Sequence, residues 1–112
     1  MPRWRQELTK SLHQSRSMPE SRYFQLASVG LSGEPFCRTV VYRGLTDDNH
    51  LIIISDTRSE KFTQLMHNAN AQVCWYFSKT REQYRFSTRA NIKTLEHDEA
   101  FVQSYWEKLS DA

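Results

Sequence analysis

The order of strand patterns along the chain constrains its fold more than any other feature of the sequence. Five segments have the alternating, β-branched or aromatic character of β-strands, and polar turns separate most of them. These segments are 23–29, 35–42, 51–55, 71–77 and 83–90. Only the third and fourth are separated by a segment with helical periodicity, so parallel strands joined by crossover helices are disfavoured. We therefore predict a mainly β fold, a small antiparallel split β-barrel with short helical covers.

Helical patterns near the beginning and the end of the sequence are expected to cover this barrel. Trp4, Leu8 and Leu12 recur every four residues, which places them along one side of a helix over 3–15. A second amphipathic helix is predicted over about 97–108. Its apolar stripe consists of Phe101, Val102, Tyr105, Trp106 and Leu109.

Length and composition indicate one folded domain over 1–112. A chain of 112 residues with 38% hydrophobic and 12% aromatic side chains can form one core, so disorder is disfavoured. The net charge of +2 permits anionic ligands but does not provide the dense basic face of a dedicated DNA-binding protein. No segment has the apolar length of a signal peptide or membrane span. We expect a soluble, cytoplasmic protein that binds neither nucleic acid nor membranes.

The spacing of cysteine and histidine does not support a metal site. Cys37 and Cys74 form no C-x-x-C pair, and we expect them to be reduced, half-buried strand residues. The histidines, which share no ligand spacing, are His13, His50, His67 and His97. Motifs for nucleotide binding by G-x-G-x-x-G or a P-loop, and for hydrolysis by G-x-S-x-G or H-E-x-x-H, are missing from the sequence. No metal is predicted, the catalytic residues are not identified, and any redox chemistry requires a cofactor.

A polar segment, 55–61, joins the third strand to a helix expected over about 58–68. Thr57-x-x-Glu60 matches a capping box, which by itself explains a polar helix start without any ligand. The unpaired backbone N–H groups and the positive dipole end of such a helix also favour a bound anion. The segment is therefore a candidate phosphate site.

Cationic side chains add weight to the phosphate interpretation. Arg58 and Lys61 fall in the predicted first helical turn, where a cation is disfavoured unless an anion accompanies it. Ser55 and Ser59 supply hydroxyl donors. Arg38 lies in the middle of the second strand, where a desolvated guanidinium needs an anionic partner. That partner is either a ligand phosphate or a carboxylate of the protein.

The last strand carries a polar face and an apolar face. Gln83 and Arg85 share the polar face, and the Gln83 amide suits a heteroaromatic edge such as a flavin pyrimidine ring, or equally a solvated surface. An aromatic cluster is large enough for a ring platform, although such stripes usually form a core. It consists of Trp75, Tyr76, Phe77, Tyr84 and Phe86.

Several separated motifs resemble those of the pyridoxamine 5′-phosphate oxidase-like, FMN-binding split barrels. They are Arg38-Thr39-Val40-Val41-Tyr42-Arg43, Ile54-Ser55, Ser59-x-Lys61 and Gln83, in the order of the family. Further phrases look like a branch found in cyanobacteria and plants. These are Ser21 to Ala27, Asp56 to Lys61, Cys74 to Phe77, and Arg81-Glu82-Gln83.

The resemblance implies FMN as cofactor, held at the interface of a homodimer. It assigns the FMN phosphate to Arg38 and Lys61, with help from Ser59 and Arg58, and the isoalloxazine edge to Gln83. The remaining cofactor-binding residues are Thr39, Val40, Val41, Ile54 and Ser55, and Arg43 is placed on the substrate side.

The resemblance also has two departures. Where the oxidases place a tyrosine and, one turn later, an arginine that holds the substrate phosphate, this chain has Tyr105 and Leu109. Relatives usually continue through further strands past the position of Ala112, so we expect a fragment or a reduced member of the family.

Three functions follow as hypotheses. The first is an FMN-dependent oxidase of pyridoxamine or pyridoxine 5′-phosphate, with hydride transfer to the flavin and reoxidation by oxygen. The second is a flavin or tetrapyrrole carrier without turnover. The third is a single-stranded nucleic-acid binder, which uses arginines together with aromatic rings as a stacking platform on a small barrel. Its residues are Arg81, Arg85, Arg89, Tyr84 and Phe86.

Overall fold

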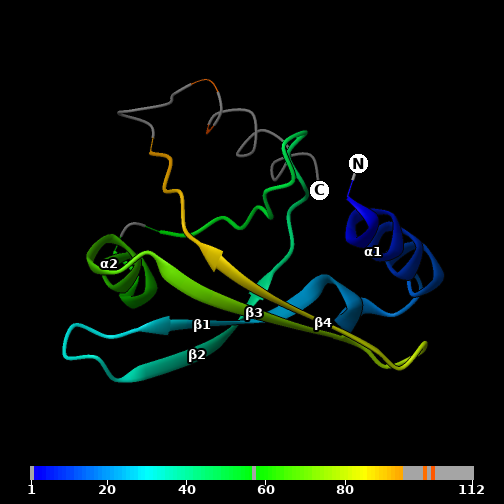
Figure 1. Cartoon of the computed structure of the whole chain (residues 1–112), viewed down its shortest axis with the longest axis horizontal. Coiled ribbons are helices and arrows are strands. Elements are labelled where there is room, and N and C mark those ends of the chain that lie inside the picture. Colours follow the sequence, from blue (N-terminus) through cyan, green and yellow to red (C-terminus); the bar gives the residue numbers. More distant parts are fainter. Residues whose placement is uncertain (1, 57, 95–99, 101, 103–112) are drawn as a thin grey trace.

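The structure, a computed structural model, describes residues 2–56, 58–94, 100 and 102. Within this part of the chain the centre is a four-stranded antiparallel sheet in the order β2-β1-β3-β4 (Figure 1). The elements are α1 (Arg3–Gln14), a 3-10 turn η1 (Pro19–Arg22), β1 (Tyr23–Val29), β2 (Pro35–Val41), α2 (Glu60–His67), β3 (Asn70–Phe77) and β4 (Glu82–Arg89). The predicted antiparallel sheet with short helical covers is confirmed.

The hairpin between β1 and β2 sets the position of Arg38. Its turn requires a left-handed residue, which Gly33 supplies at φ +90° without a Cβ clash. The Gly30 N–H donates to the Glu34 carbonyl at 2.7 Å and closes the turn. The resulting register places Leu26 of β1 opposite Arg38 of β2.

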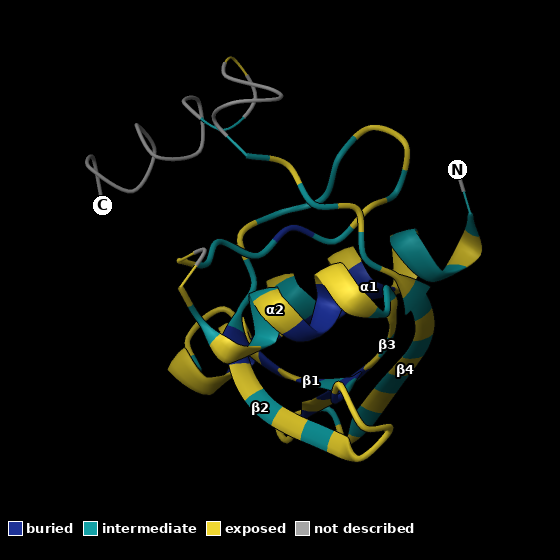
Figure 2. Cartoon of the chain, turned by 90° about the vertical axis from the view of Figure 1, so that its left-hand side faces the viewer, coloured by how far each residue is buried: buried dark blue, intermediate teal, exposed yellow. Residues whose placement is uncertain are grey.

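Cross-strand partners share a face of a sheet, so the register defines two faces. The inner face carries, in one row across the sheet, Arg38, Leu26, Val73 and Phe86. The adjacent row points to the outer face and consists of Thr39, Gln25, Cys74 and Arg85. Both α1 and α2 lie on the same side of the curved sheet, over its inner face (Figure 2). The alternation predicted for β2 and β4 is confirmed.

The core is centred on Trp75, whose side chain is completely buried on the inner face of β3. Its ring lies 4.9 to 5.3 Å, centroid to centroid, from the rings of Phe24, Tyr42 and Phe77. The indole N–H donates to the carbonyl of Ser21 at 2.9 Å, so a buried polar group is satisfied. Trp75 and Phe77 are therefore core residues, as their burial tendency suggests, rather than a ring platform.

Helix α1 covers the end of the sheet near the β3–β4 turn. Leu8 is completely buried, and the Ser11 hydroxyl lies 2.7 Å from the hydroxyl of Tyr84 and donates to Glu82 at 2.9 Å. Burial at this contact raises the pKa of Tyr84. The amphipathic helix expected from the spacing of Leu8 and its neighbours is confirmed within one residue.

The predicted third strand over 51–55 is wrong. The run has only short backbone pairing, with the Ile52 N–H donating to Gly44 and the Arg43 N–H donating to Ile52, each at 2.9 Å. Among the described residues, Ile52 is the only buried member of the run. An apolar run indicates burial, but a strand also needs backbone hydrogen bonds to a partner strand along its length. Here the run is paired only with a few residues of the neighbouring turn segment, so no strand forms.

The start of α2 also differs from the prediction. The N-cap is Ser59, whose hydroxyl accepts from the Phe62 N–H at 3.3 Å, and the helix begins at Glu60 rather than near 58. The reason is a turn at Asp56. The side-chain and backbone oxygens of Asp56 accept hydrogen bonds from the N–H groups of residues 58 and 59 before the helix begins. Thr57 lies outside the described residues.

Most of the predicted helix over 97–108 also lies outside the described residues. Only Ala100 and Val102 of that segment are described, and both are helical. The positions of Tyr105 and Leu109 are not part of the described structure.

We predict that Trp75→Ala lowers the free energy of unfolding by about 3–5 kcal/mol, because it removes a fully buried ring and leaves a cavity. Urea-induced unfolding measures this difference. The control is Tyr76→Ala, next in the chain but 53% exposed on the outer face, which should cost less than about 1 kcal/mol. Equal losses in the two variants would contradict a core centred on Trp75.

Candidate cofactor site

Arg38 is anchored between β1 and α2 by three oxygens. Its Nη1 donates to the Ser28 hydroxyl at 2.6 Å and to the Leu26 carbonyl at 3.4 Å. Its Nη2 donates to the side-chain oxygen of Gln64 at 2.7 Å. Ser28 and Gln64 are 4% and 3% exposed, so the guanidinium is held by side chains that belong to the protein interior.

The charge of Arg38 is not neutralised by these partners. All three acceptors are uncharged, and no carboxylate of the described residues lies within 4.0 Å of the guanidinium. A partly buried cation with only neutral acceptors is expected to attract an anion, because desolvation raises the cost of leaving the charge uncompensated. The alternative that a protein carboxylate pairs with Arg38 finds no support in the described part of the chain.

Further donors gather at the N-terminus of α2. The hydroxyls of Ser55 and Ser59 lie 3.0 Å apart, which ties the cap to the preceding segment. Lys61, in the first turn, makes no hydrogen bond or ion pair with any described residue. It precedes Gln64 by three residues and so lies along the same side of the helix. Lys61 is thus part of α2, and Arg38 reaches the same helix from β2 through Gln64.

Arg58 is placed differently from its prediction. It precedes the helix, and its guanidinium forms an ion pair with Asp56 at 2.7 Å while remaining 89% exposed. The hydrogen bonds from Arg58 lower the pKa of Asp56 from 3.8 to about 2. The idea that Arg58 is an unpaired cation in the first helical turn is therefore wrong, and the charge near α2 comes from Arg38 and Lys61.

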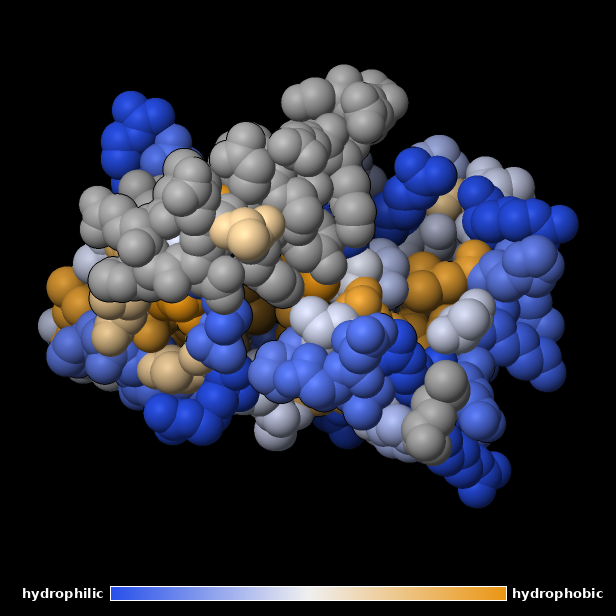
Figure 3. Space-filling view, turned by 90° about the horizontal axis from the view of Figure 1, so that it is seen from above, coloured by the Kyte–Doolittle hydropathy of each residue, from blue (hydrophilic) through white to orange (hydrophobic). Residues whose placement is uncertain are grey.

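An open groove of about 1320 Å³ lies between the inner face of the sheet and the segments 45–55 and 90–94. Hydrophobic side chains show between hydrophilic rims in this view of the molecule (Figure 3). Its lining includes Phe24, Leu26, Ile52, Ile53, Leu65, Val73 and Phe86, with Ile54, Ser55 and Lys61 at the α2 end. Polar side chains of the segments 46–50 and 87–94 complete the lining. The groove is large enough for a ring system, and its apolar wall on the sheet is of the kind that ligand sites have.

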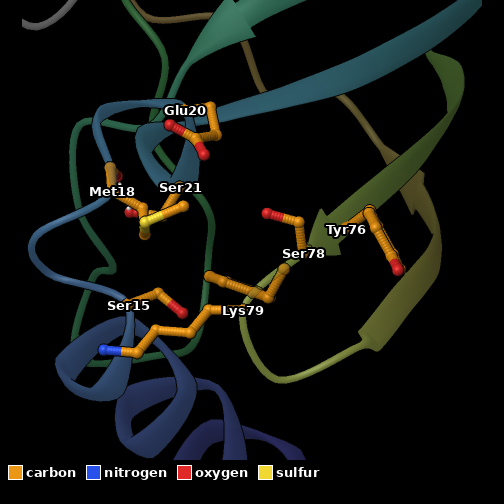
Figure 4. Close-up of a pocket in the computed structure, with 8 residues that line it drawn as sticks. Ser15, Met18, Glu20, Ser21, Tyr76, Ser78 and Lys79 are labelled. Atoms are coloured by element: carbon orange, nitrogen blue, oxygen red, sulfur yellow. Dashed lines mark hydrogen bonds between the residues drawn. The ribbon is translucent and has the colours of Figure 1, made fainter.

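A second hollow lies beside the C-terminal end of α1 and carries no such chemistry. Figure 4 shows Lys79 extending past Ser15, while Tyr76 points away. The Ser15 hydroxyl is buried and has no hydrogen-bond partner among the described residues. The hollow has no room for a water molecule, so it is not a ligand site.

Comparison with known proteins identifies the family. Residues 1–94 match the family model described as pyridoxamine 5′-phosphate oxidase, FMN-binding domain. The chain belongs to this family. The family match also supports FMN as the cofactor, as the motifs predicted.

Individual relatives agree with this assignment. Pyridoxine/pyridoxamine 5′-phosphate oxidase 2 of Arabidopsis thaliana is 40% identical over 90 residues, which are 80% of this chain and 46% of that protein. A pyridoxamine 5′-phosphate oxidase-related, FMN-binding protein from Nostoc punctiforme has 37% identity and a TM-score of 0.81, covering 90% of this chain and 55% of that one. The chain thus spans about half the length of the relatives it matches.

A more distant structure shares the fold. PhzG from Burkholderia lata, solved with tetrahydrophenazine-1-carboxylic acid, has a TM-score of 0.71 at 21% identity, covering 88% of this chain and 50% of that one. These matches confirm that the sheet and its covers have the FMN-binding fold of the pyridoxamine 5′-phosphate oxidase family.

Some of the predicted cofactor-binding residues suit FMN, and others lie on a different face of the sheet. Arg38, Lys61 and the two serine hydroxyls are donors of the kind that suit a phosphate. Ile54, Ser55 and Lys61 line the groove, whereas Arg38 is not among its lining residues and meets α2 at Gln64. Val40 is buried in the core of the inner face. The other predicted residues lie elsewhere: Thr39, Val41 and Gln83 point to the outer face, and Arg43 is exposed just beyond β2.

The faces of β4 also bear on the nucleic-acid hypothesis. Tyr84 and Phe86 stack on each other on the inner face, where Tyr84 contacts α1. Arg85 and Arg89 are exposed on the outer face. The proposed platform is therefore wrong, because two of its arginines, Arg85 and Arg89, lie on the opposite side of the sheet from its rings.

Sequence reasoning missed Ser28 and Gln64. Each is a buried polar residue at a position that usually carries an apolar side chain. Ser28 is the next inward-facing residue of β1 after Phe24 and Leu26. Gln64 lies beside the buried Leu65 in α2. A polar residue at an inward position indicates a buried hydrogen-bond network, which is the signal that could have found them.

A metal site and a membrane-spanning helix are not seen in the described part of the chain. No group of three or more His, Cys, Asp or Glu side chains is arranged to hold a metal ion. No described helix has the length and apolar character needed to cross a membrane.

We predict that Arg58→Gln raises the pKa of Asp56 from about 2 towards 3.8, because the guanidinium is the main cause of the lowering. Since the folded pKa is the lower one, the pair's contribution to stability is present above about pH 4 and is lost as the pH falls towards 2. Carboxyl ¹³C NMR titration measures the shift. Lys61→Gln, which removes a cation that is not paired with Asp56, is the control and should leave the titration unchanged.

Proposed function

We propose that the protein is an FMN-dependent oxidoreductase whose substrate is pyridoxamine or pyridoxine 5′-phosphate. The observation that carries the cofactor part is the Arg38 guanidinium, which is held by buried neutral acceptors beside the donors of α2. The substrate part rests on the names of the relatives and on the family, since the chain spans about half of their length. FMN, when bound, would accept hydride from the substrate and pass electrons to oxygen.

The chain's own residues would bind and orient this cofactor. Arg38 and Lys61 would hold the phosphate, with Ser59 as a further donor, through charge-assisted hydrogen bonds. Ile54 and Ser55, which line the groove, would contact the ribityl chain and ring. Exclusion of water by the apolar groove would strengthen these polar contacts.

We further propose that two copies of the chain complete the site. Gln83 and Arg38 lie on opposite faces and on strands at opposite edges of the sheet, so one chain does not offer both to one flavin. A homodimer would let Gln83 of the partner subunit meet the ring whose phosphate Arg38 holds. Arg43, exposed just beyond β2, would then lie on the substrate side. A cytoplasmic location stays a prediction.

We predict that the protein keeps flavin absorbance after it is mixed with FMN and desalted, and that it sediments as a homodimer. Arg38→Ala and Lys61→Ala should each weaken FMN binding about 10- to 100-fold, the effect of losing a charge-assisted hydrogen bond. Fluorescence quenching of FMN measures this. Arg58→Ala is the matched control, because its partner is Asp56 and its affinity should stay within about twofold of wild type.

The outcome against this proposal is equally specific. A wild-type sample without flavin absorbance after desalting would contradict cofactor binding, and a loaded monomer would contradict the two-copy site. Equal losses from Arg58→Ala and Arg38→Ala would indicate a general effect of surface charge.

A second candidate, flavin binding without turnover, is favoured by one observation. Arg38, the main residue proposed to bind phosphate, is held by three acceptors, whereas Arg43, the only predicted substrate residue, is exposed and makes no side-chain hydrogen bond with the described residues. Under anaerobic conditions we expect pyridoxamine 5′-phosphate to bleach the bound flavin, and Arg43→Ala to slow the bleaching. Stable absorbance with excess substrate would instead support the carrier.

A further inference from the structure

Gln64 has a hydrogen-bond environment unlike that of any other described residue on α2. The side chain is 3% exposed, and both ends of its amide are engaged. The oxygen accepts from Arg38 at 2.7 Å and from the Ser28 hydroxyl at 2.5 Å. The amide nitrogen donates to the carboxylate of Glu60 at 3.2 Å. These contacts fix the orientation of the amide, with its oxygen towards the cation.

The amide therefore separates a cation from a carboxylate. Glu60 is one helical turn before Gln64 and is not paired with Arg38, since no ion pair links them. A carboxylate in the position of the Gln64 oxygen would form a close ion pair with Arg38 and cancel its charge. A neutral amide instead holds the guanidinium in place and leaves the charge available.

We propose that Gln64, supported by Ser28, is a positioning residue that gives the site its selectivity for a phosphate-bearing flavin over a neutral one. Gln64 acts through Arg38 and does not itself touch the cofactor. The inference rests on the proposed binding of FMN by Arg38. It assigns the discrimination between FMN and riboflavin, which lacks the phosphate, to the uncharged character of position 64.

The test exchanges the two side chains in the double variant Glu60→Gln/Gln64→Glu. The exchange keeps composition and net charge and moves the carboxylate by one turn, next to Arg38. We expect the ratio of FMN affinity to riboflavin affinity to fall at least about tenfold, with riboflavin affinity within about threefold of wild type. Flavin fluorescence quenching measures both affinities, and Glu60→Gln alone is the control that should keep the wild-type ratio.

A merely structural role for Gln64 predicts a different result. Loss of packing would weaken FMN and riboflavin alike and leave their ratio unchanged, and a wild-type ratio in the folded double variant overturns the inference. If the double variant does not fold, Ser28→Ala tests the same point, because it removes one Arg38 partner without adding charge. Its FMN affinity should fall about 3- to 10-fold while its riboflavin affinity holds, and an unchanged ratio again overturns the inference.

The two proposals fail in different ways. Wild-type protein that binds neither flavin overturns both the proposed function and this inference. Wild-type protein that prefers FMN, together with a double variant that keeps the preference, overturns only the role of Gln64.

Discussion

The buried indole of Trp75 joins the parts of this structure that would otherwise be independent. Its ring packs against residues of β1, β3 and the segment after β2, and its N–H holds the carbonyl of Ser21 just before β1 begins. This contact fixes where β1 enters the sheet. Because side chains alternate along a strand, a shift of one residue would turn every inward side chain outward. The inward position of Arg38 therefore depends on the packing around Trp75.

The inner face is largely apolar, with polar groups where it meets α1, at Tyr84 and Glu82, and where it meets α2. There Ser28, Arg38 and Gln64 form a connected polar network whose buried members all have partners. Satisfied networks of this kind remove the penalty of burying polar groups, whereas a charge without a counter-ion still raises the free energy of the site. An anion at the same place would lower it. The property that makes this region costly for folding is the one that makes it suitable for a phosphate.

The predicted cofactor-binding residues of one chain lie on two opposite faces of the sheet. The inner face is covered by α1, α2 and the groove segments, and Arg38 meets α2 on that side. No helix of the described residues covers the outer face, and Gln83, Thr39 and the exposed rings of Tyr23 and Tyr76 lie on it. Features that a linear motif lists together are separated by the thickness of the sheet. An assembly of two chains is one arrangement that brings them together again.

Local patterns alone determined much of this protein. The strands β1, β2, β3 and β4 and the helix α1 follow from alternation and from four-residue spacing, which depend on near neighbours in the chain. The motifs from Arg38 to Gln83, in their order, were enough to place the chain in its family, because several separated matches are specific together. The phosphate-binding character of Arg38 and Lys61 was visible as a hypothesis in the same way.

Tertiary structure alone decided the rest, because it depends on which groups meet across space. The run 51–55 looked like a strand, but its ladder partners are few and lie in a turn. Arg58 looked like a ligand cation, but Asp56 reaches it across a turn. Gln64 carried no motif, and its contact with Arg38 appears only when the fold brings α2 against the sheet. Sequence periodicity reports the environment a residue prefers, and only packing determines which partner it finds.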